Sequence, residues 1–129
     1  MTNDSPKVSI IIPHWNGIDI LSECLISLFK TKHDSYEVIV VDNASTDGSQ
    51  SWIKNKYPQV KLIENNKNYG YAGGCNIGAL EAKGEYLVFL NNDTIQDPDW
   101  IQNLENFIKK DNMIAAVQPK VLNYFNKNI

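Results

Sequence analysis

Acidic and amide side chains follow two apolar runs of this chain, where they could bind a polar ligand. The run Tyr36–Val41 ends at Asp42, and the run Tyr86–Leu90 leads into Asn91–Asp93. An apolar, β-branched run that stops at a carboxylate is typical of a buried parallel strand, which delivers the acid to the carboxyl edge of the sheet. Ligands of open α/β sheets bind at that edge. Two acids there predict a site for a polar ligand, and a metal ion fits the same pattern.

Asp42 has two interpretations. Aspartate is common in turns, and Asp47 fits that role well, because with Gly48 and Ser49 it can cap a following helix. Asp42 fits it less well, because it comes directly after Val41 and its carboxylate would project from the sheet edge. There it can accept a hydrogen bond from a ring N–H such as a pyrimidine imide. We therefore predict a ligand contact at Asp42 and a turn role at Asp47.

Asp93 is the candidate metal ligand. Mg²⁺ prefers oxygen ligands and binds through one or two carboxylates together with substrate phosphates and water. One aspartate at a strand end, together with the side-chain amide of Asn91 two residues earlier, can provide such a metal site. The alternative is that Asn91–Asp93 simply form a turn. Asp97 and Asp99 flank Pro98, and a position at the start of a helix explains them.

A glycine-rich loop, Asn68–Gly74, leads into a predicted helix N-terminus, where backbone N–H groups can meet an anionic or hydroxyl-rich ligand. It matches neither the dinucleotide fingerprint nor the P-loop. Lys67 beside it is either a phosphate partner or a solvated side chain. His14 has no second histidine nearby, so a turn or rim position is predicted for it rather than a metal ligand.

Composition limits the classes of protein to consider. The 129 residues suffice for about one domain, and 43% apolar with 21% charged residues is ordinary for a soluble globular protein. The net charge is −3 with no basic stripe, which argues against nucleic-acid binding. All 12 basic residues are lysine, so a bound phosphate would need lysine, backbone N–H groups or a metal. No run approaches the ~20 apolar residues of a transmembrane segment.

Two cysteines, Cys24 and Cys75, lack the spacing of a metal site. Buried free thiols in a reducing compartment are the expected state, so we predict a cytoplasmic protein.

Apolar runs of strand type alternate with helical runs, which predicts an α/β fold: a mostly parallel sheet with helices on both faces, in three layers. The expected strands are Val8–Pro13, Glu37–Val41, Val60–Glu64, Tyr86–Leu90 and Ile114–Leu122. The expected helices are Asp19–Lys30, Ser49–Lys56, Ala72–Lys83 and one that starts at Asp97-Pro98 and continues to Ile108. Residues 1–122 form the predicted domain, and 123–129 a frayed tail.

Two spatial expectations follow. The glycines of Ala72–Lys83 cost about 1 kcal/mol each in a helix, so close packing should require them. If the first strand lies between the second and the fourth, Asp42 and Asp93 stand ~10 Å apart, which suits a nucleoside at one end and metal-bound phosphates at the other.

Five stretches of the chain resemble the GT-A glycosyltransferases of family 2, which use nucleotide-diphosphate sugars, and they occur in that family's order. They are Val8–Gly17, Val40–Ser49, Asn68–Gly78, Leu87–Thr94 and Val117–Leu122. The Asn-Asn-Asp-Thr version is most similar to rhamnosyltransferase-like bacterial members that build surface polysaccharides. The resemblance covers nearly the whole chain.

The resemblance implies roles for particular residues. Those implied for nucleotide binding are Pro13, Asp42, Asn68, Gly70 and Asn91, with Asp42 at the base and Asn68 and Gly70 over the ribose or diphosphate. Asp93 would bind Mn²⁺ or Mg²⁺ as the acid of the family's D-x-D element. The first position of that element is Asn91 here, so the contact there would be neutral and the metal affinity weaker.

The implied activity is inverting transfer of a sugar from a UDP-, dTDP- or GDP-sugar to a polysaccharide or lipid-linked acceptor. The family's general base lies beyond the fifth strand, outside these residues, so the chain resembles the donor-binding half of a longer enzyme. The full-length enzyme would be cytoplasmic, with the inner face of the membrane as an alternative. A non-catalytic nucleotide-sugar-binding module is the second hypothesis. A sugar-phosphate nucleotidyltransferase ranks last, because no glycine-rich, basic loop follows the first strand.

Overall fold

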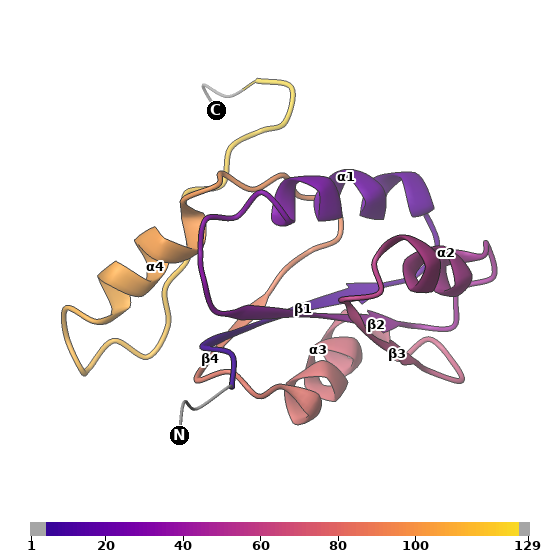
Figure 1. Ribbon diagram of the computed structural model, residues 1–129, viewed down its shortest axis with the longest axis horizontal. Coiled ribbons are helices and arrows are strands. Elements are labelled where there is room, and N and C mark those ends of the chain that lie inside the picture. Colours follow the sequence, from indigo (N-terminus) through magenta and orange to yellow (C-terminus); the bar gives the residue numbers. More distant parts are fainter. Residues whose placement is uncertain (1–4, 127–129) are drawn as a thin grey trace.

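Four parallel strands form one sheet in the order β3-β2-β1-β4, in a computed structural model that describes residues 5–126 (Figure 1). The strands are β1 Val8–His14, β2 Tyr36–Asp42, β3 Lys61–Glu64 and β4 Tyr86–Phe89. The helices are α1 Ile18–Leu28, α2 Ser49–Lys56, α3 Gly70–Glu81 and α4 Trp100–Ile108. The first four expected strands are confirmed, each to within one residue at either end.

Alternate residues of the strands enter two separate cores. Ile10 and Ile12 of β1 face a cluster that includes Leu21 and Leu25 of α1 and Trp100 of α4. Ile11 faces the other side, in a smaller cluster with Ile39 and Val41 of β2, against which Ile77 of α3 packs. Helices α1 and α2 thus cover one face and α3 the other, as the ribbon shows (Figure 1). The expected three-layer arrangement is confirmed.

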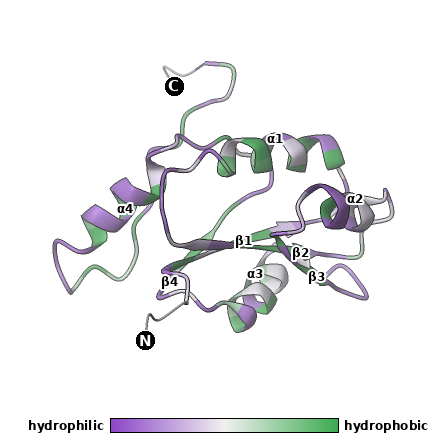
Figure 2. Cartoon of the chain, in the orientation of Figure 1, coloured by the Kyte–Doolittle hydropathy of each residue, from purple (hydrophilic) through white to green (hydrophobic). Residues whose placement is uncertain are grey.

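Helix α1 shows why this sequence folds onto a sheet. Leu21, Cys24, Leu25 and Leu28 repeat at intervals of three and four residues and are fully buried, whereas Ile20 and Ile26 are half exposed. Hydrophobic and hydrophilic segments alternate along this helix accordingly (Figure 2). Burial of its apolar stripe, rather than helix propensity, supplies most of the stability of such a helix.

Close packing explains the glycines of α3. A methyl group at Gly74 would lie 2.9 Å from Cβ of Pro13, and one at Gly78 would lie 2.4 Å from Cγ2 of Ile11. The helix backbone therefore lies directly on β1, as the cost of glycine in a helix led us to expect.

Replacing Gly78 by alanine should destabilise the protein, because the added methyl group overlaps Ile11 and touches Val41 at 3.0 Å. We expect the free energy of unfolding to fall by about 1–3 kcal/mol in urea titrations. Asn76→Ala, at an exposed position of the same helix, is the control and should change it by less than about 0.5 kcal/mol. An unchanged Gly78→Ala protein would contradict the close approach of α3 to β1.

One carboxylate ties α4 to the amino end of the sheet. Glu105 is 7% exposed and accepts hydrogen bonds from Lys7, Lys109 and His33, the last at 2.8 Å. Burial alone would raise the pKa of Glu105, but the hydrogen bonds from Lys109, Lys7 and His33 outweigh it and lower the pKa to about 2. The carboxylate is therefore held ionised in the folded state.

Glu105 should make stability depend on pH. Its depressed pKa stabilises the fold above the ordinary value of 4.5, and this contribution is lost as the pH falls from 4.5 towards about 2. We expect Glu105→Gln to lower the free energy of unfolding near neutral pH by about 1–3 kcal/mol and to flatten its fall in acid. Glu81→Gln, which removes an exposed ion pair with Lys61, is the control, with a loss of at most about 1 kcal/mol. Equal losses in the two variants would contradict this role.

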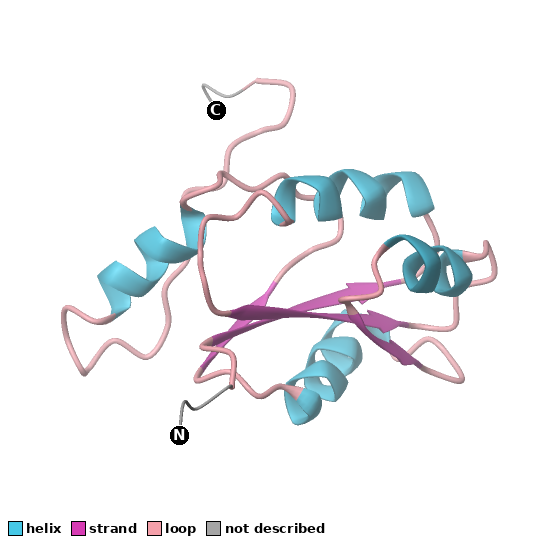
Figure 3. Cartoon of the chain, viewed as in Figure 1, coloured by secondary structure: helices cyan, strands magenta, loops and turns pink. Residues whose placement is uncertain are grey.

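The expected strand Ile114–Leu122 is wrong. Residues 109–126 run as irregular loop and turns (Figure 3). Residues 116–120 instead lie across a hollow of about 490 Å³ from α4. A strand needs a hydrogen-bonded neighbour, and Pro119 lacks a donor. The outer side of β4 therefore gains no neighbour from this segment, and Leu87 and Phe89 remain 44% and 49% exposed.

The start of the last helix also differs from the prediction. Asp97 and Pro98 lie before α4, which begins at Trp100, and Asp97 Oδ1 accepts the N–H of Asp99 in the preceding turn. Of the predicted tail, 127–129 fall outside the described residues, and the division at residue 122 stays a prediction.

Candidate functional site

The carboxyl ends of three neighbouring strands define the candidate site. Strand β1 lies between β2 and β4, with His14 paired to Asp42 and Ile11 paired to Phe89. The polar segments that follow β2 and β4 therefore stand on either side of the end of β1. This is the strand order on which the expected separation of Asp42 and Asp93 depended.

A hollow of about 360 Å³ opens at this edge. It is lined by Pro13, Tyr71, Asn91, Asn92 and Asp93. Three residues predicted from the sequence, Pro13, Asn91 and Asp93, are thus brought together. Asp42, Asn68 and Gly70 do not line it, and Tyr71 and Asn92 were not predicted.

Asp42 lies beneath the surface. It is fully buried, and its Oδ2 accepts hydrogen bonds from the N–H of Ser45 at 3.0 Å and from Nε2 of Gln50 at 2.7 Å. Its Oδ1 is a buried side-chain atom without a hydrogen-bond partner in the described part of the chain. An unpaired buried carboxylate oxygen is costly and marks a place where a donor is needed. A ligand N–H can reach this atom only if its protein cover moves, so the base contact stays a prediction.

Asn43 is a positioning residue that the sequence analysis missed. Its side chain is nearly buried, and Nδ2 donates to the carbonyl of Gly70 at 3.1 Å. Its Oδ1 accepts hydrogen bonds from Nδ2 of Asn65 at 2.9 Å and from the N–H of Tyr69 at 3.4 Å. Asn43 thus fixes the loop before α3 to the end of β2. Its position directly after Asp42 at a strand end was the available signal.

Asn68 and Gly70 shape the same loop. Asn68 Oδ1 accepts the N–H of Gly70 at 2.8 Å, and Gly70 has a φ of 73°, in the left-handed region that favours glycine. Helix α3 begins at Gly70, so the two residues set where its N-terminus meets the sheet edge. Lys67 lies 5.0 Å from the ring centre of Tyr69, outside the lining of the hollow.

His14 is buried, which corrects the predicted turn or rim position. It is the last residue of the central strand and is 1% exposed. Its Nδ1 lies 3.1 Å from Nδ2 of Asn92 and its Nε2 lies 2.9 Å from Oγ of Ser49. An amide nitrogen can only donate, so Nδ1 accepts and the proton resides on Nε2. Burial lowers the pKa of His14, although Asp42 and Asp47 oppose that effect, and the ring is neutral at pH 7.

The connection continues beyond His14. Ser49 Oγ donates to Oδ1 of Asp47, whose Oδ2 accepts the N–H of Gly17 at 2.7 Å. The neighbouring loops are joined a second time, because Asn16 N–H donates to Ser45 Oγ and Asn16 Oδ1 accepts the N–H of Thr46, each at 2.8 Å. A continuous set of hydrogen bonds therefore links the segment after β4 to the loops after β1 and β2.

Protonation of His14 should destabilise the fold. Its folded pKa lies below the ordinary 6.5, so the unfolded chain binds the proton more readily and stability is lost as the pH falls below 6.5. We expect the free energy of unfolding from urea titrations to fall between pH ~7.5 and ~5.5, and His14→Gln to remove part of this fall. Glu81→Gln is the control, because it retains His14 and the pKa of Glu81 lies below 4.5, outside this range; this variant should keep the whole fall in stability. The same pH dependence in wild type and His14→Gln would contradict the assignment.

The segment Asn91–Thr94 is held against α1. Thr94 Oγ1 donates to the carbonyl of Asn91 at 2.8 Å, and the thiol of Cys24 donates to the same carbonyl at 3.7 Å. Cys24 and Cys75 are both free and buried, as expected. Burial raises the pKa of the Cys24 thiol, which suits a structural role rather than a reactive one.

The side-chain oxygens of Asn91–Asp93 fit a hard cation that receives its remaining ligands from a bound substrate. Within residues 5–126, His, Cys, Asp and Glu side chains form no group of three or more that could enclose a metal. Asp93 is an exposed residue that lines the hollow together with Asn91 and Asn92. Mg²⁺ and similar ions accept one protein carboxylate when phosphates and water supply the other oxygens. The residues therefore fit a cation that arrives with a diphosphate.

Comparison with known proteins identifies the family. Residues 9–128 match the family model described as Glycosyl transferase family 2. The poly(ribitol-phosphate) beta-glucosyltransferase of Bacillus spizizenii is 38% identical over 110 residues, which cover 81% of this chain and 17% of that protein. The chain belongs to glycosyl transferase family 2, and this part of the sequence-based assignment is confirmed.

Solved structures agree with the fold. The mannosyltransferase PcManGT of Pyrobaculum calidifontis, in complex with GDP-Man and Mn²⁺, matches with a TM-score of 0.73 at 28% identity, over 81% of this chain and 32% of that one. S. aureus TarS 1–349, in complex with UDP-GlcNAc, matches with a TM-score of 0.74 at 23% identity, over 88% and 37%. The expected GT-A α/β fold is confirmed.

The chain spans 17–46% of the length of three curated relatives that it matches. None of the helices within residues 5–126 has the length and apolar character needed to cross a bilayer.

Proposed function

We propose that this chain is the donor-binding part of an inverting glycosyltransferase, which transfers a sugar from a nucleotide-diphosphate sugar to a polysaccharide or lipid-linked acceptor. The observation that carries the proposal is the hollow at the carboxyl edge, where Asp93 and Asn91 stand beside Pro13 at the end of the central strand. Family membership supports the reaction class. Two fold neighbours hold GDP-Man with Mn²⁺ and UDP-GlcNAc, which supports this class of donor.

Asp93 is the proposed ligand of Mn²⁺ or Mg²⁺. None of the five residues that line the hollow is basic, and the chain contains no arginine. The negative charge of a diphosphate therefore needs a counter-charge that these side chains do not supply. A divalent cation, when bound, neutralises the charge that develops on the leaving diphosphate. Asn91, a neutral side chain where the family's element has an acid, would contact the ribose or the cation more weakly.

The remaining residues position the nucleotide. Asp42 would accept a ring N–H of the base at Oδ1 after its cover opens, and Pro13 would line the pocket through its backbone. Asn68 and Gly70 would close over the ribose or diphosphate from the start of α3. These roles give a reason for the hydrogen bonds that fix the loops at the carboxyl edge of the sheet, because a ligand binds more tightly to a site that is already ordered.

The acceptor side of the reaction belongs to a region outside these residues. Inverting transfer needs a carboxylate base to deprotonate the acceptor hydroxyl. We propose that the base comes from the rest of the whole protein, so these residues alone bind the donor with little or no turnover.

Rhamnosyl or hexosyl transfer in surface polysaccharide synthesis, by a cytoplasmic enzyme at the inner face of the membrane, is the finer proposal. The B. spizizenii relative, named for poly(ribitol-phosphate), is in keeping with it.

Asp93→Ala should weaken metal-dependent donor binding. We expect calorimetry with UDP-, dTDP- and GDP-sugars and Mn²⁺ to detect binding of at least one donor to the wild type. The affinity of Asp93→Ala should be lower by at least about tenfold, because the cation loses its carboxylate.

Asp99→Ala is the matched control, since Asp99 is an exposed acid that contacts Lys32 at 3.5 Å, away from the hollow. It should bind the donor as the wild type does. No binding of any donor, or equal binding by wild type and Asp93→Ala, would contradict the proposal.

A further inference from the structure

Tyr71 stands in the hollow without a role in anything described so far. It lies in the first turn of α3, and its side chain is 51% exposed. It lines the same hollow as Asn91 and Asp93, which come from the segment after β4. Tyr71 itself comes from α3, the helix that covers the face of the sheet opposite to α1 and α2 (Figure 1). A half-exposed aromatic ring at a concave polar site is the type of surface that packs against a ligand ring.

The position of Tyr71 is fixed by its helix. The carbonyl of Gly70, the residue before it, accepts a hydrogen bond from Asn43. One turn further on, α3 lies so close to β1 that a methyl group at Gly74 would be 2.9 Å from Pro13. The backbone that carries Tyr71 is therefore held at the edge of the hollow before a ligand binds.

The chemistry of the hollow favours a sugar ring. Besides Tyr71, it presents the ring of Pro13, the amides of Asn91 and Asn92 and the carboxylate of Asp93. Amides and carboxylates bind hydroxyl groups, and flat apolar surfaces pack against the C–H face of a sugar. A nucleobase is the weaker match, because its proposed partner Asp42 ends β2, on the far side of β1 from β4.

We propose that Tyr71 is a ligand-binding residue whose ring packs against a sugar ring of the nucleotide-diphosphate sugar, in the hollow that it forms with Pro13 and Asn91–Asp93. The sugar is either the ribose of the nucleotide or the hexose to be transferred, because both offer hydroxyl groups on a C–H framework. The proposal rests on the proposed function for the identity of the ligand. The expected binding of a sugar ring is argued from the residues that line the hollow, which are an aromatic residue, two asparagines and an aspartate besides Pro13.

The test compares Tyr71→Ala and Tyr71→Phe with the wild type by calorimetry, with UDP, UDP-glucose, dTDP-glucose and GDP-mannose in the presence of Mn²⁺. We expect Tyr71→Ala to weaken binding about five- to tenfold and Tyr71→Phe, which keeps the ring, by at most about twofold. Equal weakening for UDP and UDP-glucose assigns the ribose, and weakening for the sugar nucleotides alone assigns the hexose.

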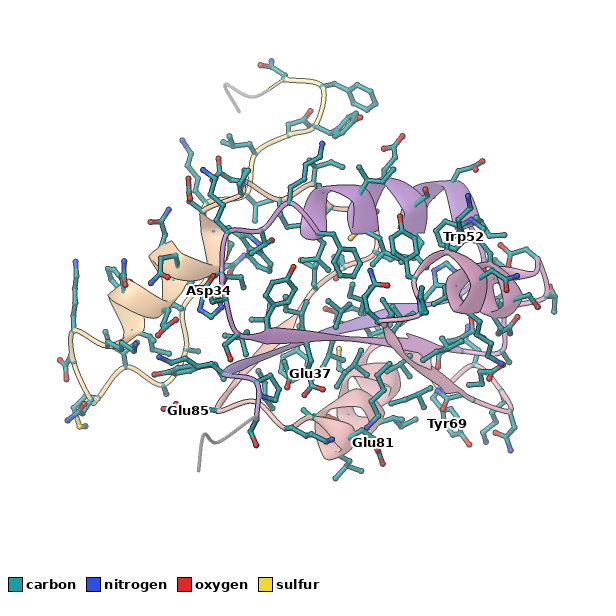
Figure 4. All side chains as sticks on the ribbon, in the orientation of Figure 1. Asp34, Glu37, Trp52, Tyr69, Glu81 and Glu85 are labelled. Atoms are coloured by element: carbon teal, nitrogen blue, oxygen red, sulfur yellow. The ribbon has the colours of Figure 1, made fainter. Side chains whose placement is uncertain are left out.

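Tyr124→Ala is the matched control. Tyr69, labelled in Figure 4, is unsuitable because it lies between Asn68 and Gly70 in the loop proposed to bind the ligand. Tyr124 is 62% exposed, packs edge-to-face on Phe125 and does not line the hollow. It should bind donors as the wild type does. Thermal unfolding of each variant establishes that the fold is retained.

A second measurement separates this proposal from the proposed function. Saturation-transfer NMR with free glucose, mannose and rhamnose reports a sugar in the hollow without any nucleotide. If donors bind wild type and Tyr71→Ala equally, the proposed function stands and the role of Tyr71 is overturned. If no donor binds but a free sugar does, and Tyr71→Ala removes that signal, Tyr71 stands and the proposed function fails. If neither donors nor free sugars bind, both are overturned.

Discussion

The complete burial of β1 is the constraint on which the rest of the structure depends. All seven residues of this strand are buried, because β2 and β4 flank it and helices cover both of its faces. A strand enclosed in this way ends where polar side chains begin, and β1 ends at His14. The segments after β2 and β4 are thereby brought to either side of one point. The candidate site follows from the central position of β1, because pairing with this strand is what brings the segment after β2 and the segment after β4 to the same edge of the sheet.

Hydrogen bonds between short polar side chains, rather than ion pairs, shape the site. Asn43 and Asn16 reach from the end of one strand to a neighbouring loop, and the hydrogen bond between Asn92 and His14 joins the segment after β4 to the end of β1. The ion-paired Glu105 lies on α4, joined to Lys7 just before β1, at the opposite end of the central strand. These side chains, together with Ser49 and the carboxylate of Asp47, hold the loops through hydrogen bonds. Asp93 is the acidic side chain that lines the hollow, whereas the carboxylate of Asp42 is fully buried and does not line it.

Much of this could be predicted from local pattern. Strands β1 and β2 contain apolar runs that are buried on both faces, and such runs are easy to detect; β3 and β4 are shorter and partly exposed, and their place between helical runs made them predictable. The failure at Ile114–Leu122 has the opposite cause, because a strand exists only with a neighbour, and an apolar sequence cannot say whether one is present. His14 was misplaced because its burial comes from Asn92 and Ser49, 78 and 35 residues away. Asn43 and Tyr71 were missed for a similar reason: one acts on a distant loop, and the other matters only through the hollow that it shares with Asp93.

The most direct test of the account is where a divalent cation binds. Paramagnetic broadening of amide resonances by Mn²⁺, in the presence of the donor that binds, locates the ion on the protein without reference to turnover. The account predicts the strongest broadening at Asn92, Asp93 and Thr94 and in the first turn of α3, with the residues around Glu105 unaffected. Broadening centred on another acidic part of the surface, such as Asp97 and Asp99, or broadening that ignores the donor, would contradict it.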